Sequence, residues 1–132
     1  MGCAERLAPG PYGDYVLSVG RLETVKRHDL AVRALAGVRA PLRLVVAGEG
    51  TQDANLRRVA EDLGVSGRVT FEGAVDDERL LALYAGALGV VYTPFDEDFG
   101  YVTLEAFLAR KPVVTARDSG GPLEFVVDGT NG

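Results

Sequence analysis

"LRLVVAGEGT", residues 42–51, is a short apolar run that ends in two glycines and leads into a segment with helical periodicity. An apolar run of this kind is typical of a strand that is buried on both faces of a parallel sheet. Similar runs recur along the chain, and a segment with helical periodicity follows each of them except the last. The runs are "YVLSV" at 15–19, "LRLVVA" at 42–47, "RVTF" at 68–71, "LGVVY" at 88–92 and "PVVTA" at 112–116.

The intervening segments predict helices at 27–38, 51–63, 76–85 and 100–109, with Thr51 and Asp76 as capping residues. This alternation predicts an α/β fold, a Rossmann-like doubly wound parallel sheet whose strands are joined by right-handed crossovers. Ligands of such sheets bind beyond the carboxyl ends of the strands. The residues that follow each strand are therefore the candidate site.

Length and composition indicate one globular domain. The chain has 132 residues, 47% of them hydrophobic and 25% charged. Residues 1–14 are rich in Gly and Pro and predict a linker or disordered tail, so the domain is expected at 15–132. The end, "VVDGTNG", lacks the helix that should follow, which suggests a piece of a larger protein that is truncated at its C-terminus.

Charge and cysteine content exclude several classes of function. The net charge of −5 argues against nonspecific nucleic-acid binding. Cys3 is the only cysteine and His28 the only histidine, so no disulfide or Cys/His metal site is expected, and a reducing cytoplasm fits. No apolar run approaches the roughly twenty residues that a membrane span needs.

The first strand is followed by a basic segment. Gly20, Arg21, Lys26 and Arg27 come just before a helix. Arginine and lysine next to a helix N-terminus suit the oxygens of a diphosphate, although a solvated loop is an equally ordinary interpretation.

The next two strand ends are less informative. "AGEGT" begins like a dinucleotide-binding motif, but Asp53 stands where its third glycine would be, which favours a simple tight turn. The backbone near Thr70 and Phe71 can hold a base, yet neither side chain requires one.

The fourth strand leads into "FDEDFGYVTLEAF", residues 95–107, which gathers carboxylates at a helix start. Glu97 and Glu105 can both face one ligand there, and carboxylates suit the hydroxyl pairs of a sugar or ribose. The free amides around Gly100 and Tyr101 can bind a phosphate. Asp96 and Asp98 also form an Asp-x-Asp pattern that could hold a divalent ion.

The same helix shows apolar residues at i, i+3 and i+4, namely Leu104, Phe107 and Leu108. This pattern predicts the buried stripe of the helix, with Glu105 on its flank.

The chain resembles the C-terminal, donor-binding domain of retaining glycosyltransferases of the GT-B fold, in particular family 4, the glycosyltransferases group 1. The motifs that carry the resemblance run in order from about residue 15 to the end: "VGRLETVK", "LVVAGEG", "RVTFEG", "LYAGA" and "TPFDEDFGYVTLEAFLARKPVVTARDSGG". The most specific is Glu97 followed eight positions later by Glu105.

The resemblance implies roles for individual residues. Arg21 and Lys26 match the pair that binds and stabilises the donor diphosphate, Glu97 matches the donor-sugar contact, and Glu105 matches the ribose contact. The rest of the expected substrate-binding set is Gly20, Thr70, Phe99, Gly100, Tyr101 and Val102. Neither a metal nor a cofactor is expected. Arg27 departs from the family pattern, which usually has glycine there, and can crowd the loop or add a phosphate contact.

The resemblance also implies an activity for a larger parent protein. It would transfer a hexosyl group from a nucleoside diphosphate sugar to a sugar or lipid hydroxyl with retention, using an acceptor site in an N-terminal domain. These 132 residues alone are then expected to bind but not to catalyse. The parent is expected in the cytoplasm, or peripherally at the inner membrane if its acceptor is a lipid. A noncatalytic nucleotide-sugar sensing module is the alternative, because binding residues do not prove turnover.

Overall fold

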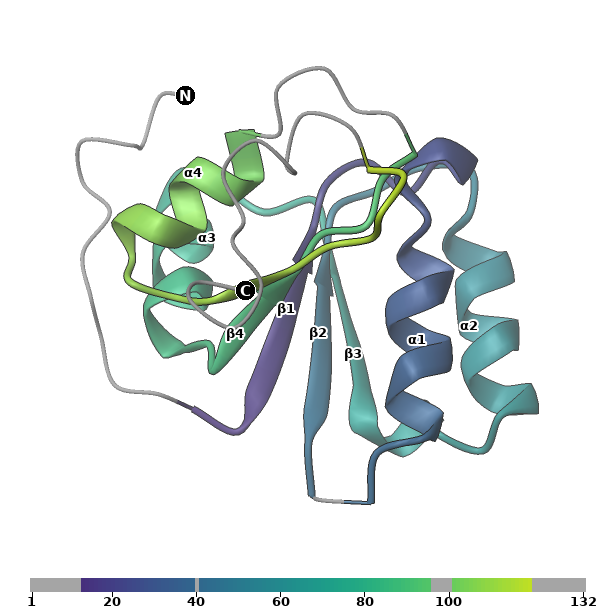
Figure 1. Cartoon of the computed structure of the whole chain (residues 1–132). Coiled ribbons are helices and arrows are strands. Elements are labelled where there is room, and N and C mark those ends of the chain that lie inside the picture. The colour runs from purple at the N-terminus through teal and green to yellow at the C-terminus, as the bar shows by residue number, and fades with distance from the viewer. Residues whose placement is uncertain (1–12, 40, 96–100, 120–132) are drawn as a thin grey trace.

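The computed structural model describes residues 13–39, 41–95 and 101–119. They form a five-stranded parallel sheet with helices on both faces (Figure 1). The strands are β1 (Tyr15–Val19), β2 (Arg43–Ala47), β3 (Val69–Gly73), β4 (Gly89–Val91) and β5 (Val113–Val114). The helices are α1 (His28–Ala36), α2 (Asp53–Asp62), α3 (Asp77–Gly86) and α4 (Tyr101–Leu108), with short 3-10 helices η2 (Thr24–Lys26) and η3 (Ser66–Arg68). The predicted α/β fold is confirmed.

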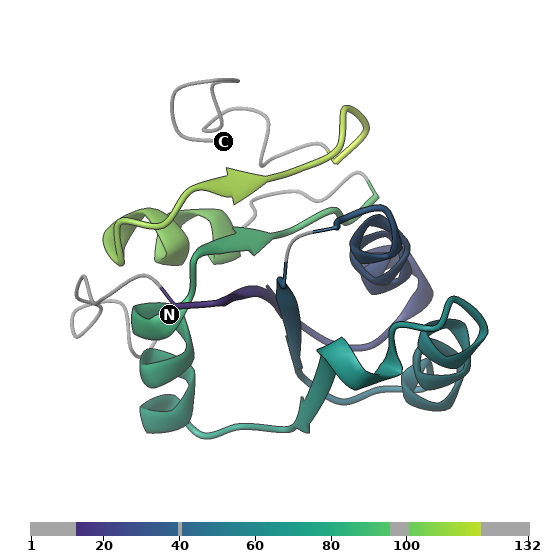
Figure 2. The ribbon, with the colours of Figure 1, turned by 90° about the horizontal axis from the view of Figure 1, so that it is seen from below.

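The order of the strands defines where a ligand can bind. The sheet runs β3-β2-β1-β4-β5, with every neighbouring pair parallel. Helices α1 and α2 cover one face of the sheet, and α3 and α4 cover the other (Figure 2). The direction of winding reverses between β1 and β4. Open α/β sheets bind ligands in the crevice outside the carboxyl ends of the strands at such a switch point.

The buried strand β2 separates two hydrophobic cores. Leu44 and Val46 pack in the core beneath α1 and α2, whereas Val45 and Ala47 pack in the core beneath α3 and α4. Successive side chains of a strand point to opposite faces, so a strand covered on both faces must be apolar throughout. This requirement explains the uninterrupted apolar run at 44–47, which follows the exposed Arg43.

Helices α1 and α3 begin and pack as their sequences predict. The buried positions of α1 are His28, Ala31, Val32 and Leu35, which lie on one helical face. Asp76 caps α3, because its Oδ1 accepts a hydrogen bond of 2.8 Å from the backbone N–H of Arg79.

The prediction that Thr51 caps α2 is wrong. The N-cap of α2 is Gln52, and the Thr51 hydroxyl instead donates to Glu23 Oε2 at 2.9 Å. The reason is tertiary: the loop after β2 lies against the loop after β1, where a carboxylate accepts both the hydroxyl and the backbone N–H of Thr51.

The predicted buried stripe of α4 is also wrong. Leu108 is 49% exposed, whereas Thr103, Ala106 and Ala109 are fully buried. Leu104 is half-buried, and Phe107 only partly packs against the core. A helix that is apolar on nearly all sides contains no unique stripe, and in this case the small side chains face the sheet.

Candidate functional site

The loops after β1 and β2 lie in backbone contact at the carboxyl edge of the sheet. Gly20 and Gly48 open these loops with φ of 138° and 143°. The N–H of Gly20 donates to Ala47 O at 3.0 Å, and the N–H of Gly48 donates to Gly73 O at 2.8 Å. A Cβ on Gly48 would collide with the carbonyl oxygen of Gly20, so only glycine permits this approach.

Further bonds join the loop after β2 (residues 48–52) to the loop after β1 (residues 20–27). The N–H of Leu22 donates to Glu49 O at 3.0 Å, and the N–H of Gln52 donates to Leu22 O at 2.8 Å. The Glu23 carboxylate accepts from the N–H of Thr51 at 3.0 Å. Hydrogen bonds from Thr51 hold the pKa of Glu23 below its usual value. The loop 48–52 is therefore a support for the loop 20–27.

Arg21 and Lys26 bring positive charge to this edge. The Arg21 side chain is 69% exposed, and its Nη2 lies 3.8 Å from Glu23 Oε1. An exposed ion pair of this kind contributes little stability, so a ligand can recruit the Arg21 guanidinium at small cost. Lys26 is half-buried and ends η2, two residues before α1 begins.

A hollow of about 230 Å³ lies at the carboxyl ends of the first three strands. Its walls combine glycine backbone and apolar side chains with Glu49, and Arg21 is the only cation among the described residues that line it. Such a surface can hold a flat organic group with a charged attachment. The lining residues are Val19, Gly20, Arg21, Ala47, Gly48, Glu49, Ala74, Val75 and Leu80.

His28 supports the turn at Gly20 and Arg21 from inside the protein, a role that the sequence analysis missed. Its Nδ1 lies 2.6 Å from Ser18 Oγ, and its Nε2 lies 3.1 Å from Arg21 O. Burial is the largest cause that lowers the pKa of His28. Because a carbonyl oxygen only accepts, Nε2 carries the proton and Nδ1 accepts from the Ser18 hydroxyl. The helical spacing of His28 with the buried Ala31, Val32 and Leu35 was the signal that could have found it.

The predicted site residues on α4 are only partly described. Glu105 is 9% exposed, and Val102 is half-buried and packs against the core. Glu97, Phe99 and Gly100 lie outside the described residues, as does the side chain of Tyr101, with which α4 begins.

Thr70 does not lie with the strand-end loops. It pairs with Val45 in the middle of β2, and its Oγ1 accepts a hydrogen bond of 3.3 Å from Arg43 at the amino end of that strand. The structure therefore separates Thr70 from Gly20 and Arg21.

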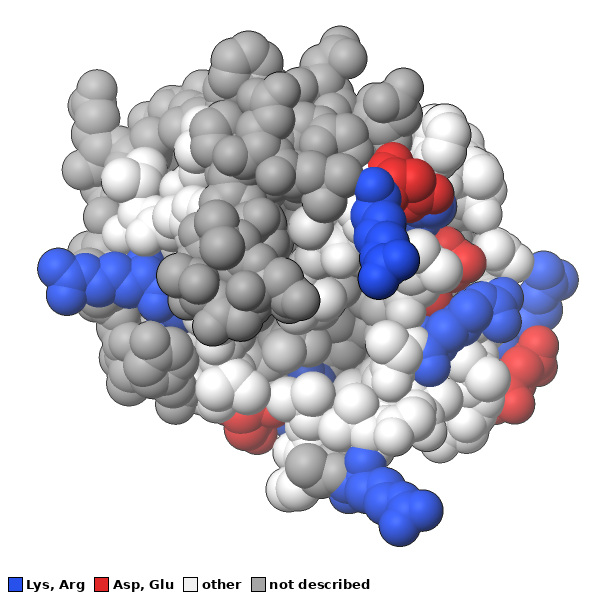
Figure 3. Space-filling view, viewed as in Figure 1, with Lys and Arg blue, Asp and Glu red and all other residues white. Residues whose placement is uncertain are grey.

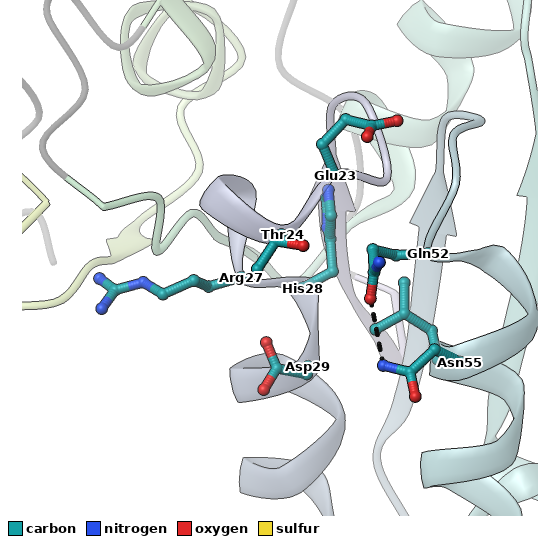
Figure 4. A pocket seen from close by; sticks show the side chains of 8 residues that line it. Glu23, Thr24, Arg27, His28, Asp29, Gln52 and Asn55 are labelled. Atoms are coloured by element: carbon teal, nitrogen blue, oxygen red, sulfur yellow. Dashed lines mark hydrogen bonds between the residues drawn. The ribbon is translucent and has the colours of Figure 1, made fainter.

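A second cavity, of about 120 Å³, lies between the N-terminal ends of α1 and α2. In Figure 4 Arg27 points away from this cavity, while Asn55 donates to Gln52 Oε1 at 3.2 Å. Its lining residues are Glu23, Thr24, Arg27, His28, Asp29, Gln52, Asn55 and Leu56.

Charged side chains are mixed on the visible surface. On the face drawn in Figure 3, basic and acidic side chains of the described residues lie interspersed. Within residues 13–39, 41–95 and 101–119, no three His, Cys, Asp or Glu side chains are grouped so that they could hold a metal ion. In the same part of the chain, no helix is long and apolar enough to cross a bilayer.

The fold defines a Rossmann-like α/β domain, with the loops after β1 and β2 in contact at the carboxyl edge of its sheet. Residues 8–132 match the family model described as Glycosyl transferases group 1, and the chain belongs to this family. It is 39% identical over 132 residues to the D-inositol 3-phosphate glycosyltransferase of Acidothermus cellulolyticus, covering 91% of this chain and 29% of that protein. It is 40% identical over 119 residues to the lipopolysaccharide core biosynthesis glycosyltransferase LpsE of Rhizobium meliloti, covering 89% and 33%.

Solved structures agree with the family. HepE of Anabaena, solved in complex with UDP-glucose, superposes with a TM-score of 0.82 at 33% identity, covering 91% of this chain and 34% of HepE. The chain thus spans about a third or less of the length of these relatives.

Proposed function

We propose that this chain binds a nucleoside diphosphate sugar as the C-terminal donor domain of a retaining, family 4 glycosyltransferase. The observation that supports this most is the exposed Arg21, which follows Gly20 at the switch point of the sheet and shares its loop with Lys26. The complex of HepE with UDP-glucose supports the choice of ligand class.

Arg21 and Lys26 act on the diphosphate. Negative charge grows on the leaving diphosphate as the bond to the sugar breaks, and positioned cations stabilise that charge. His28 fixes the Arg21 backbone through a hydrogen bond to its carbonyl oxygen. The Arg21 side chain therefore contacts the phosphate from a turn whose backbone is held in place. The hollow beside Gly20, with its apolar walls, suits the base.

The α4 side of the crevice recognises hydroxyl groups. Glu105 accepts hydrogen bonds from the ribose hydroxyls, and Glu97 accepts them from the donor sugar. Phe99, Gly100, Tyr101 and Val102 surround the sugar and phosphate. Thr70 is omitted from the proposed site because it pairs with Val45 and its hydroxyl is bonded to Arg43 at the amino end of β2.

The transfer reaction belongs to a larger protein. The relatives are about three times as long as this chain, so we assign the acceptor site, for a sugar or lipid hydroxyl, to another part of such a protein. We propose hexosyl transfer there, no catalysis by these residues alone, and a cytoplasmic location, which the single Cys3 fits.

Calorimetric titration of the chain with UDP, GDP and ADP and with their glucose conjugates tests the proposed donor site. One nucleotide should bind saturably. Both Lys26→Ala and Glu105→Gln should weaken it by about tenfold, as expected for the loss of one charged hydrogen bond. The matched control is Arg33→Ala, because Arg33 is an exposed arginine of α1 whose Nε contacts Asp29 Oδ2 at 3.5 Å and which lies outside loop 20–27.

Binding that these variants leave unchanged would refute the assigned roles. Donor binding without turnover by the full-length protein, in the presence of acceptors, would favour the sensing module.

A further inference from the structure

Arg27 has an unusual backbone conformation for its residue type. Its φ of 51° and ψ of 43° are left-handed, and it is both the C-cap of η2 and the N-cap of α1. A residue with a Cβ pays a conformational penalty there that glycine avoids, and such strain persists where surrounding contacts impose it. We therefore expect the contacts of the Arg27 side chain to impose this backbone conformation.

The Arg27 guanidinium crosses the switch point of the sheet. Its Nε donates to Thr93 O at 2.9 Å, and its Nη2 donates to Pro94 O at 3.0 Å, both in the segment after β4. Two bonds from the opposite side complete this junction: Thr93 Oγ1 donates to Arg27 O at 3.4 Å, and the N–H of Phe95 donates to Val25 O at 2.8 Å. Figure 4 shows the side chain extending toward these segments.

Asp118, which follows β5, completes the arrangement. Arg27 Nη1 donates to Asp118 Oδ2 at 3.0 Å, and Nη2 donates to Oδ1 at 2.6 Å, a bidentate fork. One guanidinium thus joins the segments after β1, β4 and β5. The Arg27 side chain is 22% exposed, and its contact with Asp118 lowers the pKa of that carboxyl group.

We propose that Arg27 and Asp118 form a clasp across the switch point that positions the segment leaving β4 for the donor sugar. Arg27 is then a positioning residue and not a phosphate ligand. Four of its hydrogen bonds already go to Thr93, Pro94 and Asp118. The donor part of this inference rests on the proposed function; the clasp itself does not.

Amide hydrogen exchange tests the clasp without any ligand. The variants are Arg27→Gly, which relieves the backbone penalty while it removes the guanidinium, and Asp118→Asn, which removes only the charge. We expect the Phe95 amide to exchange at least about tenfold faster in both, and the Gly48 amide, bonded to Gly73 O, to stay unchanged. Unchanged exchange at Phe95 in both variants would overturn the clasp.

Titration of Arg27→Gly with UDP and UDP-glucose tests the positioning role. We expect about tenfold weaker binding of UDP-glucose and UDP binding within about twofold of the wild type. Equal losses for both ligands would make Arg27 a phosphate ligand, and no loss for either would remove it from donor recognition; each result overturns the proposal. A wild-type chain that binds no nucleotide would refute the proposed function instead, and hydrogen exchange would still decide the clasp.

Discussion

The loops 20–27 and 48–52 begin alike, with a glycine directly after a strand, but they have different roles. Each begins with a glycine of positive φ directly after a strand of the sheet. The first presents Arg21 to solvent, whereas the second lies against the first through backbone groups and Thr51. Glycine at a strand end therefore marks a tight turn in both loops. The exposed cation Arg21 distinguishes loop 20–27, which can bind a ligand, from loop 48–52, which supports it.

The largest effect is expected from breaking the contact between the two loops. Gly48→Ala places a Cβ against the carbonyl oxygen of Gly20 at a φ of 143° and should destabilise the fold by roughly 3 kcal/mol or more. Gly64→Ala is the control, because Gly64 has φ of 72° but no neighbour within 4 Å, so it isolates backbone strain from collision. Urea unfolding of both variants measures the difference, and equal losses would show that the loops do not depend on close contact.

His28 should have the next largest effect. His28→Ala removes a buried ring and leaves Ser18 Oγ and Arg21 O without their partner, at a cost of about 2–4 kcal/mol. The lowered pKa of His28 means that the unfolded chain binds its proton more readily. Its contribution to stability is therefore complete above the unfolded-state pKa of about 6.5 and is lost as the pH falls toward the lower folded-state pKa.

Urea unfolding between pH 7.5 and pH 5 measures this contribution. The control is His28→Gln, which keeps hydrogen-bonding groups but does not titrate, and it should show a shallower loss of stability on acidification. Parallel pH profiles for the wild type and this variant would contradict a neutral, buried His28.

The smallest effect is expected at Glu23. Glu23→Gln weakens the bonds from Thr51 that join the loops, at a site where the carboxylate is near the surface. We expect a slight decrease in Tm at neutral pH, because a charged acceptor forms the stronger bonds. The decrease should vanish below the pKa of Glu23, which is itself lowered. A Tm difference that persists in acid would show that the geometry of the Glu23 side chain, and not its charge, stabilises the contact with Thr51.

The sequence predicted the fold well because buried strands and capped helices leave local signals. All five strands and all four helices lie where apolar runs and helical periodicity indicate, and Asp76 caps α3 as expected. Short 3-10 helices such as η2 have too few residues for any periodicity, and they were missed.

The rest depended on tertiary contacts that local patterns do not record. Thr51 bonds to Glu23 across two loops, and α4 packs through Ala106 instead of Leu108 because the sheet selects among many apolar positions. The same is true of Arg27, for which the sequence left open either crowding of the loop or a phosphate contact, and which the structure bonds to Asp118. Of the predicted site, Gly20 and Arg21 lie together at the hollow, whereas Thr70 lies elsewhere.

An NMR titration of the isotope-labelled chain with UDP tests whether the nucleotide binds at the loop 20–27. The amide signals of Gly20, Arg21 and Lys26 should shift in a saturable manner, whereas those of Thr70 and of Arg43, at the amino end of β2, should not. Shifts confined to the cavity lined by Asn55 and Gln52, or saturable binding that leaves loop 20–27 unperturbed, would contradict a donor site at the switch point.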